Sequence, residues 1–326
     1  MVPVPAMPSD NARGAIFMTI GMAGFVINDA LMKLVAEELP LFQAIFLRGV
    51  LTTLVFALIA WRIGALRLPQ LNGDRWLIVA RSLAECGATF FFLTALMNMP
   101  LATVTAILQA APLTIALSAA VFLREPLGWR RFLAIAVGFV GVLLIVRPGP
   151  EGIDVYAVFA LVAVCFATLR DLLTRRMPVT VPSMLLALST AGAVTLFAGL
   201  GTLGDEWVRP SQASFGLLGA TVVFILLGYL LSIMAMRVGE LGVIAPFRYT
   251  GLLWALVLGL FVFGDWPDGV TQLGAALIVG TGIFTLYREL FGRTVAAPVE
   301  AITWRLRASG EKDQVTRPHR TEVADA

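Results

Sequence analysis

Long apolar blocks, each about the length of a membrane-spanning helix, follow one another along almost the whole chain. The first block, AIFMTIGMAGFVINDALMKLV at residues 15–35, holds only two charged side chains. A helix needs about 20 mostly apolar residues to cross a bilayer. Only 14% of the 326 residues are charged, whereas a soluble globular protein carries about 25%. The pattern predicts an all-α, polytopic membrane protein, because the strands of a membrane β-barrel would be shorter and would alternate apolar and polar side chains.

Ten transmembrane helices are expected, separated by short links such as EELP and NMP. Links this short make neighbouring helices antiparallel. Residues 1–14 would form an N-terminal tail, and residues 291–326 a charged C-terminal tail with too few apolar side chains to build a core of its own. The expected spans are 15–35, 41–61, 76–96, 101–122, 129–146, 155–173, 183–203, 214–236, 241–263 and 270–287.

Basic residues are distributed unequally between the two sets of links. Cytoplasmic links of membrane proteins are enriched in Lys and Arg. One side of this chain carries Arg13, Arg62, Arg67, Arg75, Arg124, Arg130, Arg131, Arg175, Arg176 and Arg237, and the other carries only Arg147 and Arg209 beside six acidic residues. The distribution predicts that both termini are cytoplasmic. The net charge of +3 belongs to this asymmetry, so we expect a lipid bilayer as partner and no nucleic acid.

The chain matches itself at an offset of about 140 residues. At an offset of 142, Asp29 aligns with Asp171 and Lys33 with Arg175, and at an offset of 140 Glu125 aligns with Asp265. The matches divide the chain into a first repeat at 15–147 and a second at 153–288, each with five spans. Because five is odd, the second copy enters the membrane from the opposite face. Inverted repeats of this kind are typical of secondary transporters that work by alternating access.

Two pairs of opposite charges lie inside predicted spans at a spacing of four residues. Asp29 and Lys33 share one face of the first span, and Arg81 and Glu85 share one face of the third, so each pair is close enough to interact. Charges in the membrane interior are expensive and often mark substrate or ion pathways. Each pair is either structural or part of a gate or ligand site, and Glu85 is also a candidate proton carrier.

Two further arginines, Arg48 in the second span and Arg248 in the ninth, lie at depth and stay charged there. Tyr249 follows Arg248 directly, and Tyr229 lies in the preceding span. A guanidinium beside aromatic rings suits a planar heteroaromatic solute. In the duplication Gln109 aligns with Tyr249, so both are expected to face a central cavity from related positions.

The candidate residues fall into two groups, one for substrate binding and one for gating or ion pairs. For Arg248 a structural role is the alternative to substrate binding, and in that role it would form an ion pair with Asp171 or Glu85. The candidate substrate-binding residues are Asn28, Asp29, Arg48, Glu85, Gln109, Tyr229, Arg248 and Tyr249. The candidate gating or ion-pair residues are Lys33, Arg81, Asp171 and Arg175.

Several kinds of chemistry have no support in the sequence. The single histidine, His319, lies in the C-terminal tail, and the two cysteines, Cys86 and Cys165, lie in predicted spans. We therefore expect no metal site, no structural disulfide and no bound cofactor. No Gly-rich phosphate loop is present, so the chain itself is not expected to use ATP. Short links without catalytic clusters also argue against an enzyme, and no catalytic residue is proposed.

The ten-span pattern and two motifs resemble the EamA branch of the drug/metabolite transporter superfamily. LREPLGWRRFLAIAVGFVGVLLIVRPG closes the first half, PFRY opens the ninth span, and the resemblance covers about residues 15–290. ND…K in the first span, an arginine in the second and APFRY are most similar to bacterial uptake carriers for S-adenosylmethionine and riboflavin. The resemblance implies a secondary transporter of the bacterial inner membrane for a small heteroaromatic metabolite. Riboflavin uptake is the first expectation; S-adenosylmethionine uptake, or export of amino acids and related metabolites, is the alternative. Either a monomer or a homodimer fits the sequence.

Overall fold

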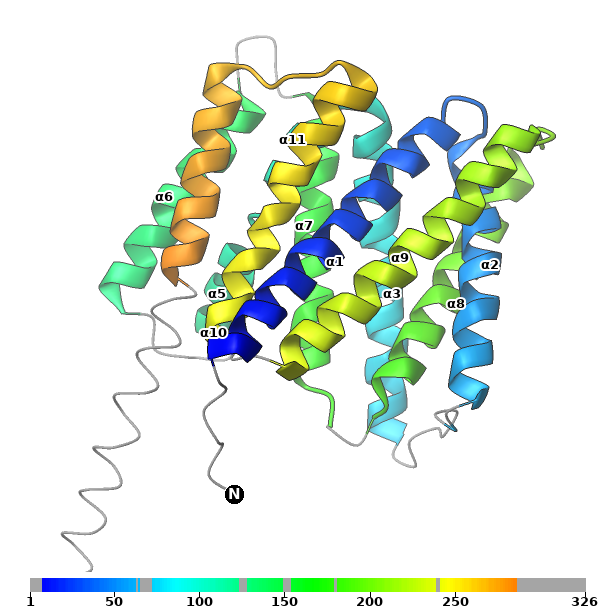
Figure 1. The fold of residues 1–326 in the computed structure, drawn as a ribbon, viewed down its shortest axis with the longest axis horizontal. Coiled ribbons are helices and arrows are strands. Elements are labelled where there is room, and N and C mark those ends of the chain that lie inside the picture. Colours follow the sequence, from blue (N-terminus) through cyan, green and yellow to red (C-terminus); the bar gives the residue numbers. More distant parts are fainter. Residues whose placement is uncertain are drawn as a thin grey trace, which may run out of the picture. The chain divides into compact units, whose positions relative to one another are not determined.

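The computed structural model is built from helices (Figure 1). It describes residues 8–62, 64, 72–122, 128–148, 154–178, 181–238 and 241–285, and no strand occurs in these ranges. The expected C-terminal tail at 291–326 and Glu125 of the repeat alignment lie outside them. The elements are α1 (Pro8–Val35), α2 (Leu41–Arg62), α3 (Asn72–Asn98), α4 (Leu101–Leu108), α5 (Ala111–Phe122), α6 (Trp129–Val146), α7 (Val155–Arg175), α8 (Ser183–Gly201), η1 (Thr202–Gly204), α9 (Gln212–Val238), α10 (Leu241–Ile244), η2 (Ala245–Tyr249), α11 (Thr250–Phe263) and a terminal helix (Gly269–Thr285).

Ten apolar helical segments confirm the expected polytopic, all-α fold. Within the described ranges, eight segments are long and apolar enough to cross a membrane, and two shorter apolar helices, Phe132–Val146 and Gly269–Thr285, complete the set. The fourth span consists of α4 and α5, and the ninth of α10, η2 and α11. α1 begins at Pro8 rather than at residue 15, with Asp10 in its first turn, where the helix dipole favours an acidic side chain.

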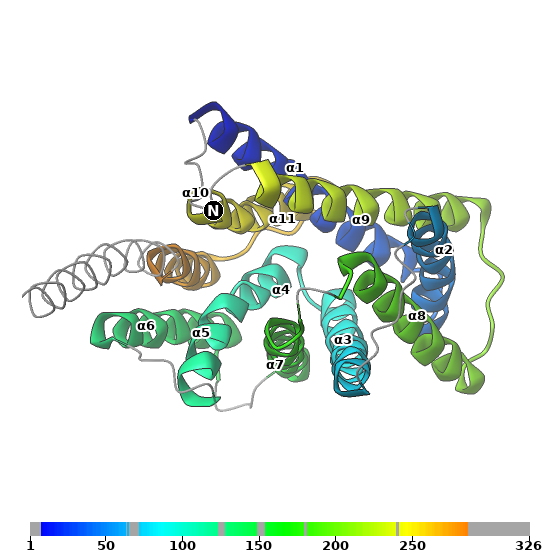
Figure 2. The same cartoon turned by 90° about the horizontal axis from the view of Figure 1, so that it is seen from below.

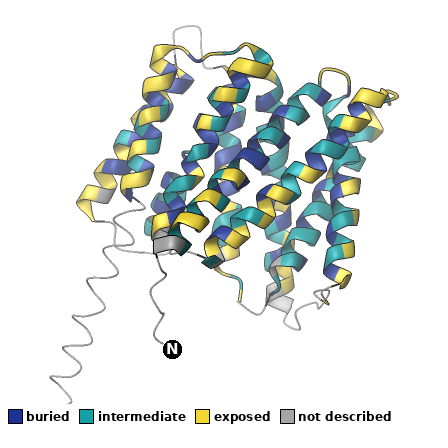
Figure 3. Ribbon diagram, in the orientation of Figure 1, coloured by how far each residue is buried: buried dark blue, intermediate teal, exposed yellow. Residues whose placement is uncertain are grey.

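The outward faces of the helices are apolar, as a lipid environment requires. Phe261 is 80% exposed, Leu196 is 67% exposed and Leu83 is 60% exposed. In Figure 3 exposed residues occur along the length of the helices and not only at their ends. So much exposed apolar surface would promote association in water, whereas hydrocarbon tails can cover it at no such cost. The protein is a multi-pass membrane protein.

Helices of the first half pack against helices of the second. α1 packs most extensively on α9, α3 on α7 and α2 on α8, and the same neighbours are visible in Figure 2. α1, α2 and α3 are the first three spans of the first half, and α7, α8 and α9 are those of the second. The α1–α9 and α3–α7 contacts are therefore exchanged when the two halves are exchanged.

Equivalent side chains of the two halves make equivalent contacts. A Cβ added to Gly87 of α3 would meet the Phe166 ring of α7 at 2.7 Å, and one added to Gly228 of α9 would meet the Phe25 ring of α1 at 2.8 Å. Both the glycines and the phenylalanines stand 141 positions apart in the sequence. The hydroxyls of Thr53 and Thr195, 142 positions apart, contact each other at 3.1 Å between α2 and α8. These contacts support the expected inverted repeat.

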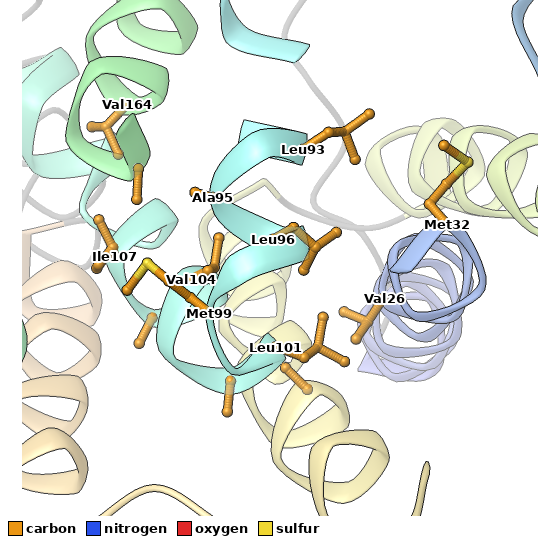
Figure 4. Packing of buried hydrophobic residues seen from close by; sticks show 14 of the residues in the cluster. Val26, Met32, Leu93, Ala95, Leu96, Met99, Leu101, Val104, Ile107 and Val164 are labelled. Atoms are coloured by element: carbon orange, nitrogen blue, oxygen red, sulfur yellow. The ribbon is translucent and has the colours of Figure 1, made fainter. Parts of the chain in front are cut away.

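The largest buried apolar cluster joins the two halves where α1, α3, α4 and α7 meet. Figure 4 shows Met32 of α1, Leu96 of α3, Val104 of α4 and Val164 of α7 within this cluster. Met32, Leu96 and Val104 have no exposed surface. Because interiors are close-packed, this cluster holds the C-terminal half of α3 and the N-terminal half of α7 in a defined orientation, and α3 and α7 carry the charged residues described next.

Candidate functional site

A salt-bridged group of three side chains connects α3 and α7 inside the bundle. The Arg170 guanidinium donates through Nη1 to Oε1 and Oε2 of Glu85, at 3.3 and 3.1 Å, and through Nε to Oδ1 of Asp171 at 2.8 Å. The side chains of Glu85, Arg170 and Asp171 are 17%, 27% and 35% exposed. One arginine is therefore bonded to two carboxylates, and all three side chains remain partly exposed.

A second charged pair lies beside this group on α1 and α2. Asp29 accepts a hydrogen bond from Nδ2 of Asn28 at 3.0 Å and lies within electrostatic range of Arg48. Arg48 in turn lies within electrostatic range of Glu85 and Tyr229. The two groups therefore form one charged cluster, which consists of Asp29, Arg48, Glu85, Arg170 and Asp171.

Tyr229 of α9 adds an aromatic ring at the edge of the charged cluster. Its ring packs edge-on against Phe25 of α1, with centroids 5.3 Å apart, and against Phe56 of α2 at 6.0 Å. It lies within electrostatic range of Glu85 and Arg170, and 41% of its surface is exposed. Side chains of α1, α2, α3, α7 and α9 thus lie near one another in one region of the bundle.

The expected pair between Lys33 and Asp29 is not formed. Nζ of Lys33 donates to the main-chain carbonyl of Met99 and lies 5.1 Å from the centroid of the Phe263 ring. Met99 follows the end of α3, where carbonyl groups have no partner within the helix. The long lysine stem reaches this acceptor near the membrane surface, while Asp29 faces Arg48. Lys33 therefore connects α1 to the end of α3.

The expected pair between Arg81 and Glu85 is also not formed. Arg81 donates to Oγ1 of Thr174 at 2.9 Å and to Oγ1 of Thr190, which connects α3 to α7 and α8. Glu85 is bonded instead to Arg170, a residue that sequence reasoning did not select. The same rule that selected Arg48, a charge inside an apolar run, applies to Arg170 in the span at 155–173. The side chain of Arg175 lies outside the described part of the chain.

Arg248 lies apart from the charged cluster. Its side chain is exposed and, within the described ranges, it forms no ion pair; Glu85 and Asp171 are bonded to Arg170 instead. The structural alternative for Arg248 is therefore wrong. Arg248 and Tyr229 do not form a shared platform either, because Tyr229 packs on α1 and α2.

Two interrupted spans face each other at Arg248. α4 ends at Leu108 and α5 begins at Ala111, while the 3-10 turn η2 precedes α11. Nε2 of Gln109 lies 3.4 Å from the carbonyl oxygen of Arg248, so one break contacts the other. Tyr249 is 5% exposed, and its hydroxyl has no hydrogen-bond partner among the described residues. Interrupted helices at corresponding positions of two repeats are a feature of transporter binding regions.

At the side of the bundle where α1 ends, links of the two halves are hydrogen-bonded to each other. Glu38 accepts from the main-chain N–H of Ser211 at 2.6 Å and from the hydroxyls of Ser211 and Ser214. These hydrogen bonds, that of Ser214 foremost, lower the pKa of Glu38 below its ordinary value. The amide of Gln43 is paired with the backbone of Val208 in both directions. These hydrogen bonds therefore join the link after α1 and the start of α2 to the link before α9 and the start of α9.

A pocket of about 520 Å³ lies elsewhere, between α4, α11 and the terminal helix. Its lining is almost wholly apolar and includes Ala106, Leu253, Leu256, Ala276 and Val279. No member of the charged cluster lines it. A polar metabolite would lose its hydration there without gaining partners. The charged cluster, rather than this pocket, is the candidate substrate site.

The chain is similar to known membrane transporters. Residues 12–147 match the EamA-like transporter family. The S-adenosylmethionine uptake transporter of Rickettsia prowazekii (strain Madrid E) is 26% identical over 284 residues, which are 85% of this chain and 93% of that protein. The pseudopaline exporter CntI of Pseudomonas aeruginosa (strain PAO1) is 26% identical over 273 residues, 82% of this chain and 93% of that protein. A crystal structure covering 86% of this chain and 99% of its own shares the fold, with a TM-score of 0.57 at 20% identity.

Proposed function

We propose that the chain is a membrane transporter of the EamA-like family and that it carries S-adenosylmethionine or a closely similar metabolite across the bacterial inner membrane by alternating access. The observation that carries the proposal is the charged cluster, in which both signs of charge from four spans meet beside Tyr229. Both termini would lie in the cytoplasm, because the basic links lie on the side of the N-terminus.

The chemistry of the cluster suits a zwitterionic solute with an additional positive charge. S-adenosylmethionine carries an ammonium group, a carboxylate, a sulfonium cation and a flat adenine ring. Asp29 and Glu85 offer acceptors to the cationic groups, Arg48 offers a guanidinium to the carboxylate, and Tyr229 offers a ring face to the sulfonium or the base. The relatives whose names mention S-adenosylmethionine uptake support the same substrate class.

Riboflavin, the first expectation from sequence, receives no support from these relatives. Its ring system is uncharged, so it would desolvate the ionic groups of the cluster without offering them an opposite charge. An uncharged solute binds better in a site with apolar walls and a few hydrogen-bonding groups. The alternative already named, S-adenosylmethionine, therefore becomes the leading candidate.

Export of an amino-acid-derived metabolite is the second candidate. It is supported by the relative named as a pseudopaline exporter, which aligns over 82% of this chain. The ammonium and carboxylate groups of such a metabolite would bind the same side chains of the charged cluster. The two candidates therefore differ in the direction of transport and in whether the solute has an aromatic part.

The test is uptake of labelled S-adenosylmethionine into proteoliposomes that contain only this protein. We expect saturable uptake that unlabelled S-adenosylmethionine abolishes and that riboflavin at the same excess leaves unchanged. S-adenosylhomocysteine, which lacks the sulfonium charge, should compete at least tenfold more weakly. Uptake of riboflavin but not of S-adenosylmethionine would refute the proposal, and amino-acid transport alone would favour the second candidate.

A variant of the charged cluster tests where the solute binds. Glu85→Gln should lower uptake at least tenfold, because the amide cannot neutralise a cationic solute. Leu83→Ala on the same helix is the matched control, since Leu83 is 60% exposed on the outward face and should retain uptake. Equal uptake by the two variants would place the solute away from Glu85.

A further inference from the structure

The apolar pocket between α4, α11 and the terminal helix extends along the terminal helix. Thr271 near the start of the terminal helix and Ile283 near its end both line the pocket. Twelve residues of helix separate them, which corresponds to about 18 Å at 1.5 Å per residue. Leu253, another lining residue, is 60% exposed, so the pocket opens toward the surrounding hydrocarbon. We call it the apolar slot.

A cation lies at the end of the apolar slot where the terminal helix begins. Nη2 of Arg147 donates to Oγ1 of Thr271, a lining residue, at 3.3 Å, and to Oδ2 of Asp268. The Arg147 side chain remains 49% exposed. Nε of Arg147 also donates to the carbonyl of Leu144 at 3.4 Å. A guanidinium has five N–H donors, so the two of Nη1 are left for a ligand. The Trp266 ring, 58% exposed, forms part of the same rim, at a depth typical of tryptophan in membrane proteins.

Arg147 is unusual in two further respects. It is one of only two basic residues assigned to the links on its side of the membrane, so the rule that places cations on the cytoplasmic side does not explain it. It is also the single non-glycine residue with a positive φ, 50°, in the described ranges, a conformation that disfavours most side chains. The backbone turns there as α6 ends, and this turn directs the guanidinium to the terminal helix.

We propose that the apolar slot and Arg147 together form a phospholipid site, in the leaflet at which α1 ends. One acyl chain occupies the slot, and the phosphate accepts hydrogen bonds from the free donors of Arg147. Arg–phosphate pairs are strong and geometrically specific. Asp268 accepts from the same guanidinium and orients it toward the rim. The apolar walls favour a hydrocarbon chain over a polar metabolite, and the walls are membrane-spanning helices, so the ligand enters from the bilayer. This site shares no residue with the charged cluster.

Native mass spectrometry of the detergent-purified full chain tests the site, with phosphatidylglycerol and a diacylglycerol of the same acyl chains as probes. We expect one phosphatidylglycerol to bind at least tenfold more tightly than the diacylglycerol. Ala276→Trp, which fills the slot from an exposed position, should lower phosphatidylglycerol binding at least tenfold. Leu273→Trp is the matched control, because Leu273 is 55% exposed on the same helix and does not line the slot. Arg147→Gln should bring phosphatidylglycerol to the affinity of the diacylglycerol.

A fluorescence measurement keeps the proposal testable if the slot-filling variant does not fold. Phosphatidylglycerol with brominated chains should quench the emission that is lost in Trp266→Phe. Absence of quenching would overturn the proposal, as would equal binding by Ala276→Trp and Leu273→Trp or equal affinity for the two lipids in the unmodified protein. All these measurements are made without solute, so their failure would leave the proposed transport function standing.

Discussion

Replacement of Arg170 by methionine should destabilise the protein more than any other single change in the charged cluster. Among the residues that the structure describes, Arg170 alone is hydrogen-bonded to Glu85, and it bonds Asp171 as well. Its removal leaves two carboxylates within the bundle without a cation in contact. Breaking a buried ion pair from one side costs about 3–5 kcal/mol. The side chains of Arg170 and Glu85 are 27% and 17% exposed, so water screens the pair in part. We therefore expect a loss of stability at the lower end of that range, about 3 kcal/mol.

The assay is equilibrium unfolding of the purified protein in mixed micelles, with the double variant Glu85→Gln/Arg170→Met as the control. Removing both partners leaves no uncompensated charge on Glu85, so the double variant should regain most of the lost stability. Arg170→Lys should fall between the two, because an ammonium keeps the charge but cannot bond two carboxylates in the forked geometry of a guanidinium. The difference between the single and double variants measures the coupling directly.

A double variant as unstable as Arg170→Met would refute this reasoning. It would mean that Arg170 acts through its packing rather than through its bond to Glu85. A stability loss below about 0.5 kcal/mol in Arg170→Met, the size of a surface effect, would mean that water reaches both carboxylates freely, and the charged cluster would then be a solvated surface rather than an interior site.

Three further outcomes are expected. Gly141→Leu should reduce the yield of folded protein, because a Cβ there meets the Gly274 carbonyl oxygen at 2.6 Å, whereas Gly280→Leu on the terminal helix, with nothing within 4 Å, should not; equal yields would contradict this. The lowered pKa of Glu38 means that its hydrogen bonds contribute stability above its unfolded-state pKa and lose it as the pH falls through the folded-state value. The protection factors of the amides in the 202–211 link, which correct hydrogen exchange for its intrinsic pH dependence, should therefore fall below about pH 4.5 and be low in Glu38→Gln at neutral pH. Protection factors that stay the same under both changes would show that these hydrogen bonds do not hold the link. Although Arg248 lies apart from the charged cluster, it lies where the two interrupted spans meet, a feature of transporter binding regions. Arg248→Ala should therefore lower transport more than it lowers the amount of folded protein, and equal losses would instead indicate a structural role.

Much of the fold could be predicted without the structure because hydropathy is a local property of the chain. The ten apolar segments were expected from their length and composition, and all ten are present as helices in the described ranges. The close packing at Gly141 follows in the same way, since small residues in a span mark a near approach of two helices. The interruption of the fourth span at Gln109 also has a local cause, the proline of the sequence LQAAPLT.

The pairing of charges could not be predicted in this way, because it depends on which helices are neighbours and on how each is rotated about its axis. Spacing along one helix indicated Lys33 with Asp29 and Arg81 with Glu85. The structure instead pairs Glu85 with Arg170 across the α3–α7 contact, 85 positions away in sequence.

The sequence by itself therefore determined the number of spans, their alternation across the bilayer and the presence of costly charges inside them. Only the tertiary structure decided which of those charges meet. Gly87 against Phe166 lets α3 approach α7 closely, and that approach, between segments far apart in the chain, brings Arg170 to Glu85.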